Sequence, residues 1–571
     1  MLSENALEIL TARYFKQGPD GQVAEDADGL FRRVARAVAA AEQHDRPAWE
    51  ERFYTAMSGL EFLPNSPTLM NAGLPEGQLS ACFVLPVPDR LEEIFDALTR
   101  SALIHQSGGG TGFNFSHLRP RGDRVGGGQG TASGPVGFIK VFDAATEQIK
   151  QGGRRRGANM GILNADHPDI LEFIRAKHPN GSLHNFNLSV GVPDRFLQAV
   201  EKGEPWQLVN PRTGKPAGEL AASEVWQALC HEAWHGGDPG LIFLDALNRG
   251  NPLPGLGLLE ATNPCGELPL LPYESCNLGS LNLSRMLKTE PSGQAGFDWD
   301  KLKDLVGLGI RFLDNVITVN HFLLPETAQI TRANRKVGLG VMGWGQALLR
   351  LGLPYASHEA VELARRLMAF IRDASYAASA ALAAERGTFP NWGLSVHHPH
   401  RPMRNASCNS IAPTGSISVI AGTSYSIEPL YALAFRRVGV LDGREQQEAD
   451  PVAREVLEGL GYWNPQTEQA ILETGSIASR EEIPEGVRRL FETAHEISWE
   501  YHLRHQQAFQ EATDNAVSKT INLPAQTGET AISQLLMQAW KMGLKGVTVY
   551  RDGSRDDQVL QHCKSAASCA M

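Results

Sequence analysis

The run Asn263-Pro264-Cys265-Gly266-Glu267 places a thiol between an amide and a carboxylate, and eleven residues after this thiol Cys276 follows in Ser275-Cys276-Asn277-Leu278-Gly279-Ser280. Proline and glycine beside Cys265 favour a loop over a helix or strand. If these side chains face one cavity, the thiol can act on a substrate atom while Glu267 exchanges a proton and Asn263 holds a polar group. By itself the run is equally compatible with a loop that carries a buried cysteine and a solvated glutamate.

The composition is that of a soluble globular enzyme. The chain has 571 residues, 42% hydrophobic and 20% charged, which suffices for several domains or for one large barrel with insertions. The formal net charge of −11 would repel a polyanion, so we expect no nucleic-acid partner, and any phosphate must be bound by local features. Residues 1–18 carry charges without a continuous apolar run, and no later run reaches membrane-spanning length. We therefore expect a cytoplasmic protein without a membrane partner.

The cysteines are few and odd in number, unlike the framework of a secreted disulfide-rich protein. In a reducing compartment, cysteines within polar motifs indicate chemistry or metal binding. Cys230 lies in a helical-looking segment and is interpreted as a packing residue. The seven cysteines are Cys82, Cys230, Cys265, Cys276, Cys408, Cys563 and Cys569.

Three glycine-rich stretches, at 108–112, 126–134 and 151–159, interrupt the first third of the chain. Glycine at this density favours loops whose backbone approaches a ligand or another segment closely. The first stretch lacks the lysine of a phosphate-binding P-loop, so it is a weak signal. The third combines glycine with three arginines, which predicts a loop for polar bases and phosphates, although a solvated basic turn is an alternative. The second and third flank a helix predicted at 136–150 and indicate ligand-responsive elements.

Helices and strands alternate along much of the chain. Residues 1–60 predict a helical region, and residues 160–260 alternate short strands with helices, an α/β signature. Asp89 is predicted to cap a helix at 91–105. Further expected elements are strands at 186–190, 241–244 and 545–551, a helix at 358–386 that ends at Gly387, and one long helix at 484–513.

The run Pro413-Thr414-Gly415-Ser416-Ile417 lies where a strand gives way to a predicted helix. Backbone N–H groups and hydroxyls at a helix start can bind phosphate without a lysine. A capped helix without a ligand is the alternative.

Seven ordered runs resemble the catalytic subunit of ribonucleotide reductase, most closely its adenosylcobalamin-dependent class II form, from about residue 55 to the end. The resemblance implies an α/β fold: a ten-stranded α/β barrel of two five-stranded half-barrels with a central finger loop at residues 61–555, after an N-terminal helical region at 1–60 and before a flexible cysteine tail at 556–571. The runs begin at Asn65, Ser80, Gly108, Asn263, Ser275, Pro413 and Tyr550 and read Asn-Ser-Pro-Thr, Ser-Ala-Cys, Gly-Gly-Gly-Thr-Gly, Asn-Pro-Cys-Gly-Glu, Ser-Cys-Asn-Leu-Gly-Ser, Pro-Thr-Gly-Ser-Ile and Tyr-Arg-Asp-Gly-Ser-Arg.

The resemblance also implies a radical mechanism. Cys265 on the finger loop would carry a transient thiyl radical that removes the ribose 3′ hydrogen. Asn263 and Glu267 would bind and deprotonate the 3′ hydroxyl, which eases departure of the 2′ hydroxyl as water. Cys82 and Cys276 would supply the reducing equivalents and close a disulfide.

Cys563 and Cys569 in the tail would pass reducing equivalents from thioredoxin or a similar donor to this disulfide. Their alternative is half of a zinc site with His562, but these residues supply too few ligands, so we expect no metal.

Nucleotide contacts follow from the resemblance as well. A deoxynucleoside triphosphate effector would bind a specificity site formed by Asp89, the Arg124–Ser133 loop and the Gly152–Asn159 loop, in particular Asp89, Arg124, Gly152, Gly153, Arg154, Arg155 and Arg156. A site built across two subunits would favour a homodimer. The N-terminal ATP-binding cone of many relatives is not expected. The expected substrate contacts, with 414–417 around the phosphates, are Ser66, Ala81, Cys82, Gly110, Asn263, Pro264, Cys265, Gly266, Glu267, Pro413, Thr414, Gly415, Ser416 and Ile417.

The source of the radical is indicated by Val549-Tyr550. Relatives that receive a radical from a separate metal-containing subunit use two adjacent tyrosines here, so a single tyrosine favours generation within the same chain by adenosylcobalamin. No Asp-x-His-x-x-Gly cobalamin motif occurs. The expected activity is reduction of ribonucleotides to 2′-deoxyribonucleotides, with ribonucleoside diphosphates as the expected substrates. The alternatives are the catalytic subunit of a two-subunit metal-radical reductase and a non-catalytic nucleotide sensor.

Overall fold

The computed structural model describes residues 2–125, 130–151, 155–178, 182–291, 293–438 and 445–554. The predictions made for Gly152, Gly153, Arg154, Cys563 and Cys569 therefore fall outside the described residues. Within the described ranges, none of the helices combines the length and the apolarity needed to cross a membrane.

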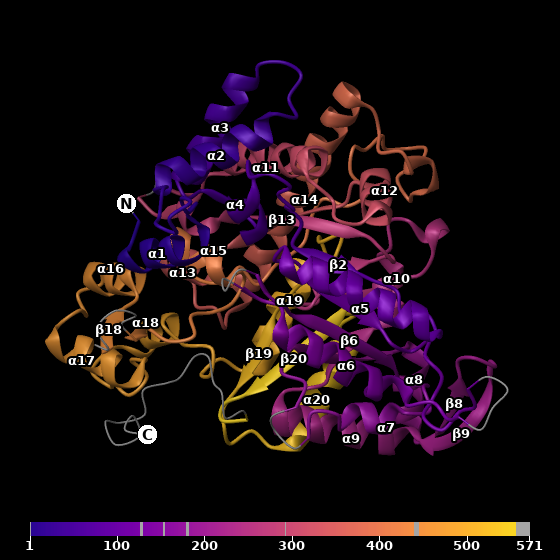
Figure 1. The fold of residues 1–571 in the computed structure, drawn as a ribbon. Helices are drawn as coiled ribbons and strands as arrows, with labels where there is room; N and C mark the ends of the chain where they lie inside the picture. Colours follow the sequence, from indigo (N-terminus) through magenta and orange to yellow (C-terminus); the bar gives the residue numbers. More distant parts are fainter. Residues whose placement is uncertain are drawn as a thin grey trace.

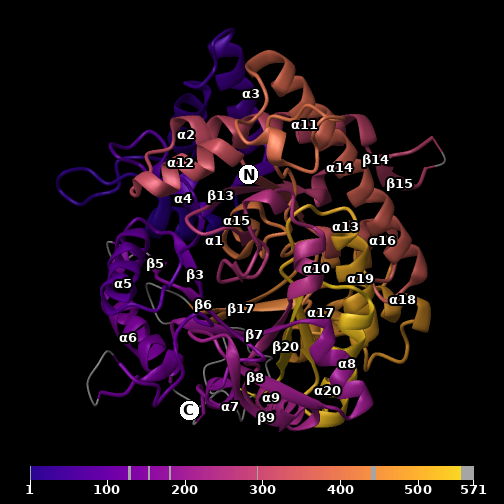
Figure 2. The same ribbon diagram turned by 90° about the vertical axis from the view of Figure 1, so that its right-hand side faces the viewer.

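The chain begins with a helical region, as predicted for residues 1–60. Leu30, Val34 and Val38 line the buried face of α2, which packs on α3 and on α11 (Figures 1 and 2). The elements of this region are α1 (Glu4–Ile9), the π-helix η1 (Leu10–Tyr14), α2 (Ala27–Ala39) and α3 (Arg46–Ser58).

A ten-stranded sheet forms the centre of the molecule. Several of its strands, such as β16, are buried along their whole length, which is typical of parallel strands covered on both faces. The strands are β1 (Phe62–Pro64), β2 (Cys82–Val84), β3 (Gly110–Asn114), β6 (Asn159–Asn164), β7 (Phe186–Val192), β10 (Gly240–Phe243), β13 (Ser275–Asn282), β16 (Val337–Met342), β19 (Thr520–Leu523) and β20 (Gly546–Arg551).

The strand directions divide the sheet into two halves. Strands β2, β3, β6, β7 and β10 run parallel to one another, and so do β13 with β16 and β19 with β20. The halves meet through antiparallel pairs, β2 with β13 and β10 with β20. Isolated bridges Leu339–Asn409 and Ile411–Val517 connect β16 to the chain just before β19. These bridges bring the two ends of the sheet near each other, and the division into two halves agrees with the predicted ten-stranded α/β barrel.

Helices surround this barrel and contribute to its two main hydrophobic cores, one that includes α11 and α14 and one that includes α5, α6, α9 and α20. They are α4 (Ser66–Asn71), α5 (Leu91–Gln106), α6 (Gly134–Gln148), α7 (Ile170–Ile174), α8 (Asp194–Lys202), α9 (Ala222–Gly236), α10 (Leu244–Arg249), α11 (Trp299–Val319), α12 (Pro325–Asn334), α13 (Trp344–Leu351), α14 (His358–Arg386), α15 (Gly415–Ala421), α19 (Trp499–Gln510) and α20 (Glu529–Lys541).

Smaller elements decorate the barrel. Helices α16, α17 and α18 pack around their own hydrophobic cluster at one side of the molecule (Figure 1). These elements are α16 (Pro451–Gly459), α17 (Pro465–Thr474) and α18 (Glu485–Leu490), the short helices η2 (Pro254–Leu256), η3 (Leu283–Arg285) and η4 (Trp392–Leu394), and the paired strands β4 (Lys150–Gln151) with β5 (Arg155–Arg156), β8 (Pro205–Asn210) with β9 (Lys215–Ala221), β11 (Ala261–Thr262) with β12 (Pro269–Leu270), β14 (Leu287–Thr289) with β15 (Ala295–Phe297), and β17 (Ala434–Val438) with β18 (Glu445–Ala449).

Two local predictions are wrong. Asp89 does not cap α5, whose N-cap is Arg90, because the Asp89 carboxylate binds the Arg119 guanidinium instead. The single helix predicted at 484–513 is broken between α18 and α19, since the backbone N–H of Ala494 donates to Leu430 outside the helix.

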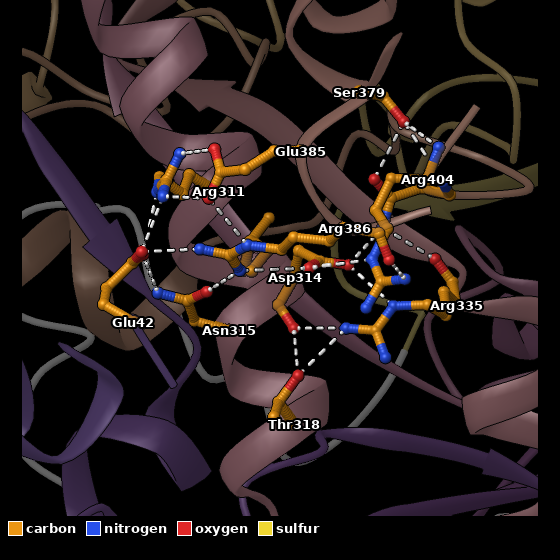
Figure 3. Close-up of polar contacts among 12 residues, drawn as sticks. Glu42, Arg311, Asp314, Asn315, Thr318, Arg335, Ser379, Glu385, Arg386 and Arg404 are labelled. Atoms are coloured by element: carbon orange, nitrogen blue, oxygen red, sulfur yellow. Dashed lines mark hydrogen bonds and ion pairs between the residues drawn. The ribbon is translucent and has the colours of Figure 1, made fainter. Parts of the chain in front are cut away.

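A buried network of charges fixes the N-terminal region to the barrel (Figure 3). Glu42 lies at the end of the α2 segment and is 3% exposed. Its carboxylate accepts from Arg311 of α11 at 2.6 Å and from Arg386 of α14 at 2.5 Å, and Arg335 pairs with Asp314 at 2.7 Å nearby. Removing one partner of such a buried pair is strongly destabilising, so these pairs tie the end of the α2 segment to α11 and α14.

Candidate active site

The predicted finger loop is a tight turn between β11 and β12. Asn263 closes it twice: its backbone N–H donates to Leu268 O at 3.2 Å, and its Oδ1 accepts from Leu268 N at 3.0 Å. Gly266 has a φ of 82°, a conformation that glycine adopts without strain. The turn therefore presents Cys265 from a rigid base.

This turn contacts both halves of the barrel. Asn187 of β7 donates to Pro264 O at 2.8 Å, while Ser410 Oγ and Ala516 N from the other half donate to Glu267 O at 2.8 and 2.9 Å. At Gly112 of β3, an added Cβ would lie 1.7 Å from Thr262 O. The loop thus runs through the barrel centre, where only glycine leaves room for it.

The structure brings three predicted cysteines together. Cys82 of β2 and Cys276 of β13 are direct partners in an antiparallel pair, where Cα atoms lie about 4.5–5.5 Å apart, within the range that a disulfide spans. Both are free and buried, whereas Cys265 is exposed. Asn263 Nδ2 donates to Cys82 Sγ at 3.1 Å.

The electrostatics keep the paired thiols protonated. Burial raises the pKa of Cys82 well above its usual range, and the nearby Glu267 carboxylate raises it further. Burial also raises the pKa of Cys276, although Lys336 opposes this shift. At neutral pH both groups are neutral thiols, the form that can give up a hydrogen.

A cavity of about 260 Å³ lies beside the finger loop. It is lined by residues from β2, β3, the finger loop and the start of α15, which are far apart in the sequence. All predicted substrate residues except Gly266 line it: Ser66, Ala81, Cys82, Gly110, Asn263, Pro264, Cys265, Glu267, Pro413, Thr414, Gly415, Ser416 and Ile417. Cys276, the partner of Cys82 on the neighbouring strand, does not line the cavity.

Thr414 shapes the α15 end of this cavity. It has a φ of 56° and precedes the first residue of the helix. Its Oγ1 lies 2.7 Å from Ser418 Oγ and accepts from Ser426 N at 2.8 Å. The backbone N–H groups of Gly415 and Ser416 are left for other acceptors at the helix start.

A second cavity of about 370 Å³ also reaches Cys265. Gly266, Asn187, Tyr550 and Gln506 line it. Gln506 is 1% exposed, and its Oε1 has no hydrogen-bond partner within the described parts of the chain. Such a buried acceptor calls for a donor from a bound molecule or water. Cys265 therefore lies in the walls of two cavities at once.

Two of the predicted effector residues, Asp89 and Arg124, lie near the start of α5, where Arg119 contacts both. Arg119 Nε contacts both Asp89 carboxylate oxygens at 3.1 and 2.8 Å, and Arg119 Nη1 donates to Arg124 O at 3.0 Å. Arg124 pairs with Thr131 in an isolated bridge. The backbone of Arg155 and Arg156 forms β5, which pairs with β4.

Sequence reasoning missed several residues of these sites. Arg119, Asn187 and Gln506 lie outside the runs that carry the resemblance, and each acquires its role only through a partner distant in the sequence. Glu274 and Lys336 form a buried ion pair at 2.7 Å beside Cys276. A glutamate directly before Ser275-Cys276 could have indicated this pair, but no signal marks Lys336.

Comparison with known proteins shows which protein family the chain matches. A family model described as "Ribonucleotide reductase, barrel domain" matches residues 80–550, and one described as "Ribonucleotide reductase, all-alpha domain" matches residues 1–77. The solved alpha subunit of a class Id ribonucleotide reductase from Actinobacillus ureae has a TM-score of 0.80 at 24% identity and 97% coverage of both chains. At this identity, the likeness supports the fold alone.

Relatives at higher identity cover almost the whole chain. A Mycobacterium tuberculosis protein named vitamin B12-dependent ribonucleoside-diphosphate reductase is 49% identical over 98% of this chain and 79% of its own length. A Thermoplasma acidophilum protein of the same name is 45% identical over 98% and 80%. A Chlamydia pneumoniae ribonucleoside-diphosphate reductase subunit alpha is 29% identical over 94% and 58%. Together with the barrel and the loop that runs through it, these matches establish that the chain belongs to the ribonucleotide reductase family.

Proposed function

We propose that the chain is a vitamin B12-dependent reductase that converts ribonucleoside diphosphates into 2′-deoxyribonucleoside diphosphates. The observation that carries this proposal is the place of Cys265 in the walls of two cavities. One cavity gathers nearly all of the predicted substrate residues, including Cys82, whose strand partner is Cys276, so the other is available to a radical-generating cofactor. The relatives at 45% and 49% identity bear the name of a B12-dependent enzyme.

The residues of the first cavity suit each step of the reduction. Cys265 as a thiyl radical takes the 3′ hydrogen, and Glu267 takes the proton of the 3′ hydroxyl. The 2′ hydroxyl then leaves as water with a proton from the cysteine pair. Cys82 and Cys276 together give two electrons and two protons and end as a disulfide; one proton leaves with the water and the other is delivered to C2′. Glu267 then returns its proton to the 3′ oxygen, and Cys265 returns a hydrogen atom to C3′ and is again a thiyl radical. Their raised pKa values suit this role, because the donated species is a neutral thiol.

The second cavity fits the adenosyl part of adenosylcobalamin. Its unpartnered acceptor, Gln506 Oε1, suits an amino group, and Asn187 and Tyr550 add further polar groups. When bound, the cofactor supplies an organic radical by homolysis of its carbon–cobalt bond. Asn187 also holds Pro264 O, so this wall of the cavity fixes the loop that carries Cys265.

Effector control is part of the proposal. Asp89, Arg124, the 152–156 segment and the additional Arg119 would form the specificity site for a deoxynucleoside triphosphate. Next to it, α5 and α6 lie side by side (Figures 1 and 2) and expose four large apolar side chains. Exposed apolar side chains on two neighbouring helices are candidates for an interface, so the homodimer is proposed to form through these helices. The four side chains are Leu91, Phe95, Leu103 and Val141.

The remaining parts of the proposal concern the chain ends. Residues 1–60 would form the helical region, 61–555 the catalytic barrel, and 556–571 a tail whose Cys563 and Cys569 accept electrons from thioredoxin or a similar dithiol protein.

Anaerobic turnover of labelled CDP and CTP with a dithiol, with and without adenosylcobalamin, tests the proposed function. Deoxyribonucleotide formed from CDP only when the cofactor is present is the expected result. Product without the cofactor would favour a metal-radical reductase, and nucleotide binding without any product would favour a nucleotide sensor; both outcomes contradict the proposal.

A further inference from the structure

A tyrosine from the N-terminal helical region reaches the wall of the substrate cavity. Tyr14, the last residue of η1, is 2% exposed. Its hydroxyl lies 2.7 Å from Ser66 Oγ, 52 residues further along the chain. Ser66 is the first residue of α4 and lines the cavity of about 260 Å³. Tyr14 can therefore influence binding in the cavity through Ser66, without touching the bound molecule itself.

Packing holds both partners of this hydrogen bond in place. Tyr14 and Leu10 belong to the same hydrophobic core as Leu69 of α4 and Ile417 of α15. Helix α1 packs on α15, while Asn65 Oδ1 caps α4 by accepting from Thr68 N at 2.9 Å. The Tyr14 segment therefore braces both the α4 and the α15 sides of the cavity.

The direction of the hydrogen bond follows from burial. Ser66 Oγ is the only hydrogen-bond partner of the Tyr14 hydroxyl among the described residues, and a buried tyrosine hydroxyl needs an acceptor for its proton. When Tyr14 donates, the hydrogen of Ser66 remains available. Donation by the phenol also polarises the serine O–H and strengthens it as a donor. Ser66 then offers a proton to an oxygen of the bound molecule.

We infer that Tyr14 is a positioning residue for the substrate: it orients the Ser66 hydroxyl as a hydrogen-bond donor to a phosphate or ribose oxygen of the nucleotide. This inference rests on the proposed function of the cavity. It gives the N-terminal helical region a part in substrate binding, beyond its packing on the barrel.

The test compares Tyr14→Phe, Ser66→Ala and the double variant with wild type. The Phe ring keeps the packing of Tyr14, so only the hydroxyl is lost. We expect Tyr14→Phe to raise the Kd for CDP, measured by calorimetry without cofactor, about fivefold, as for one lost hydrogen bond. Ser66→Ala should raise Kd at least as much, and Tyr14→Phe in the Ser66→Ala background should add nothing. In turnover, KM should rise while kcat stays within about twofold.

Tyr54→Phe is the matched control. Tyr54 of α3 donates to Asp28 on the surface of the same helical region, away from the cavity, so this variant should leave Kd and KM unchanged. Additive effects of Tyr14→Phe and Ser66→Ala, or a Kd for CDP unchanged in Tyr14→Phe, would overturn the inference. Wild type that binds CDP but forms no product would instead contradict the proposed function, since the Kd comparison does not depend on turnover.

Discussion

The Cys82–Cys276 pair can be tested as a store of two electrons. The two residues lie directly opposite each other between β2 and β13, and both are free thiols. We predict that a variant lacking both tail cysteines, Cys563→Ser/Cys569→Ser, forms about one deoxynucleotide per chain when no dithiol is present, because its single thiol pair is then oxidised. Peptide mapping after alkylation should find Cys82 linked to Cys276.

Cys230 and Cys408 are internal controls for this experiment, since both are buried outside the two cavities and should remain alkylatable after unfolding. A stoichiometric product with Cys82 and Cys276 still reduced would contradict the assignment of the electron donors.

His105 links stability to pH. It is buried on α5, its Nε2 lies 3.0 Å from Thr111 Oγ1 of β3, and burial lowers its pKa from 6.5 to about 4. The folded state therefore holds the neutral ring, whereas the unfolded chain takes up a proton as the pH falls through 6.5. The contribution of the neutral His105 ring to the free energy of unfolding is therefore fully present above pH 6.5 and decreases as the pH falls toward 4. Between pH 7 and pH 5 we expect the free energy of unfolding to fall by about 2 kcal/mol.

The variant His105→Gln keeps a hydrogen-bonding group but does not titrate. Its thermal midpoint should fall less than that of wild type between pH 7 and 5. Equal losses in both proteins would show that His105 is not responsible for the acid sensitivity.

At the scale of elements, β3 and the finger loop depend on each other. An alanine at Gly112 would bring its Cβ to 1.7 Å from Thr262 O, a backbone atom that can move only with the loop. We predict that Gly112→Ala displaces Cys265 and lowers turnover at least about 100-fold, the scale expected when a reacting group shifts by about 1 Å.

Gly307→Ala is the control for this substitution. Gly307 lies in α11 with no atom within 4 Å of an added Cβ, and alanine is the better helix former, so activity and thermal midpoint should be kept. Gly112→Ala with wild-type turnover would mean that the loop does not need this close passage.

Several elements could be predicted from local signals. The helix α14 ends at Gly387 where the sequence places its stop, and β7, β10 and β20 coincide with alternating or continuous apolar runs. The two wrong predictions concern segments whose structure is determined by contacts with residues distant in the sequence. Asp89 looks like an N-cap, but a charge-assisted bond to Arg119 is stronger than a cap. The break between α18 and α19 depends on Leu430, which no local pattern reveals.

In the candidate site, too, some features can be predicted from the sequence, whereas those that depend on distant partners cannot. The resemblance of the seven ordered runs to the family implies which residues share a cavity, and all of the implied substrate residues except Gly266 line the cavity beside the finger loop. The barrel order that brings β2 against β13, and hence Cys82 against Cys276, depends on pairing between strands almost 200 residues apart. Asn187 and Gln506 belong to none of the sequence motifs, so their place at the second cavity is known only from the folded structure.

At the scale of the whole molecule, the exposed apolar side chains of α5 and α6 lead us to predict a homodimer that forms through these helices. Phe95 of α5 is 46% exposed, and a charge buried without a partner at an interface there would oppose association. Phe95→Glu should therefore halve the mass seen by analytical ultracentrifugation and weaken the response to effector. Leu394→Glu, which changes an exposed leucine on η4, should not. A wild-type mass of one chain would contradict the dimer.

The central claim is that Cys265 links the cofactor cavity to the substrate cavity. The most direct measurement is turnover of CDP with adenosylcobalamin and a dithiol by Cys265→Ser, alongside the Kd of this variant for CDP. The account predicts no detectable deoxynucleotide, with Kd within about threefold of wild type, because an oxygen cannot replace the thiol in hydrogen transfer while the cavity wall is kept. Cys230→Ala, a cysteine outside both cavities, should remain active. Deoxynucleotide formation by Cys265→Ser at a rate near wild type would contradict the account.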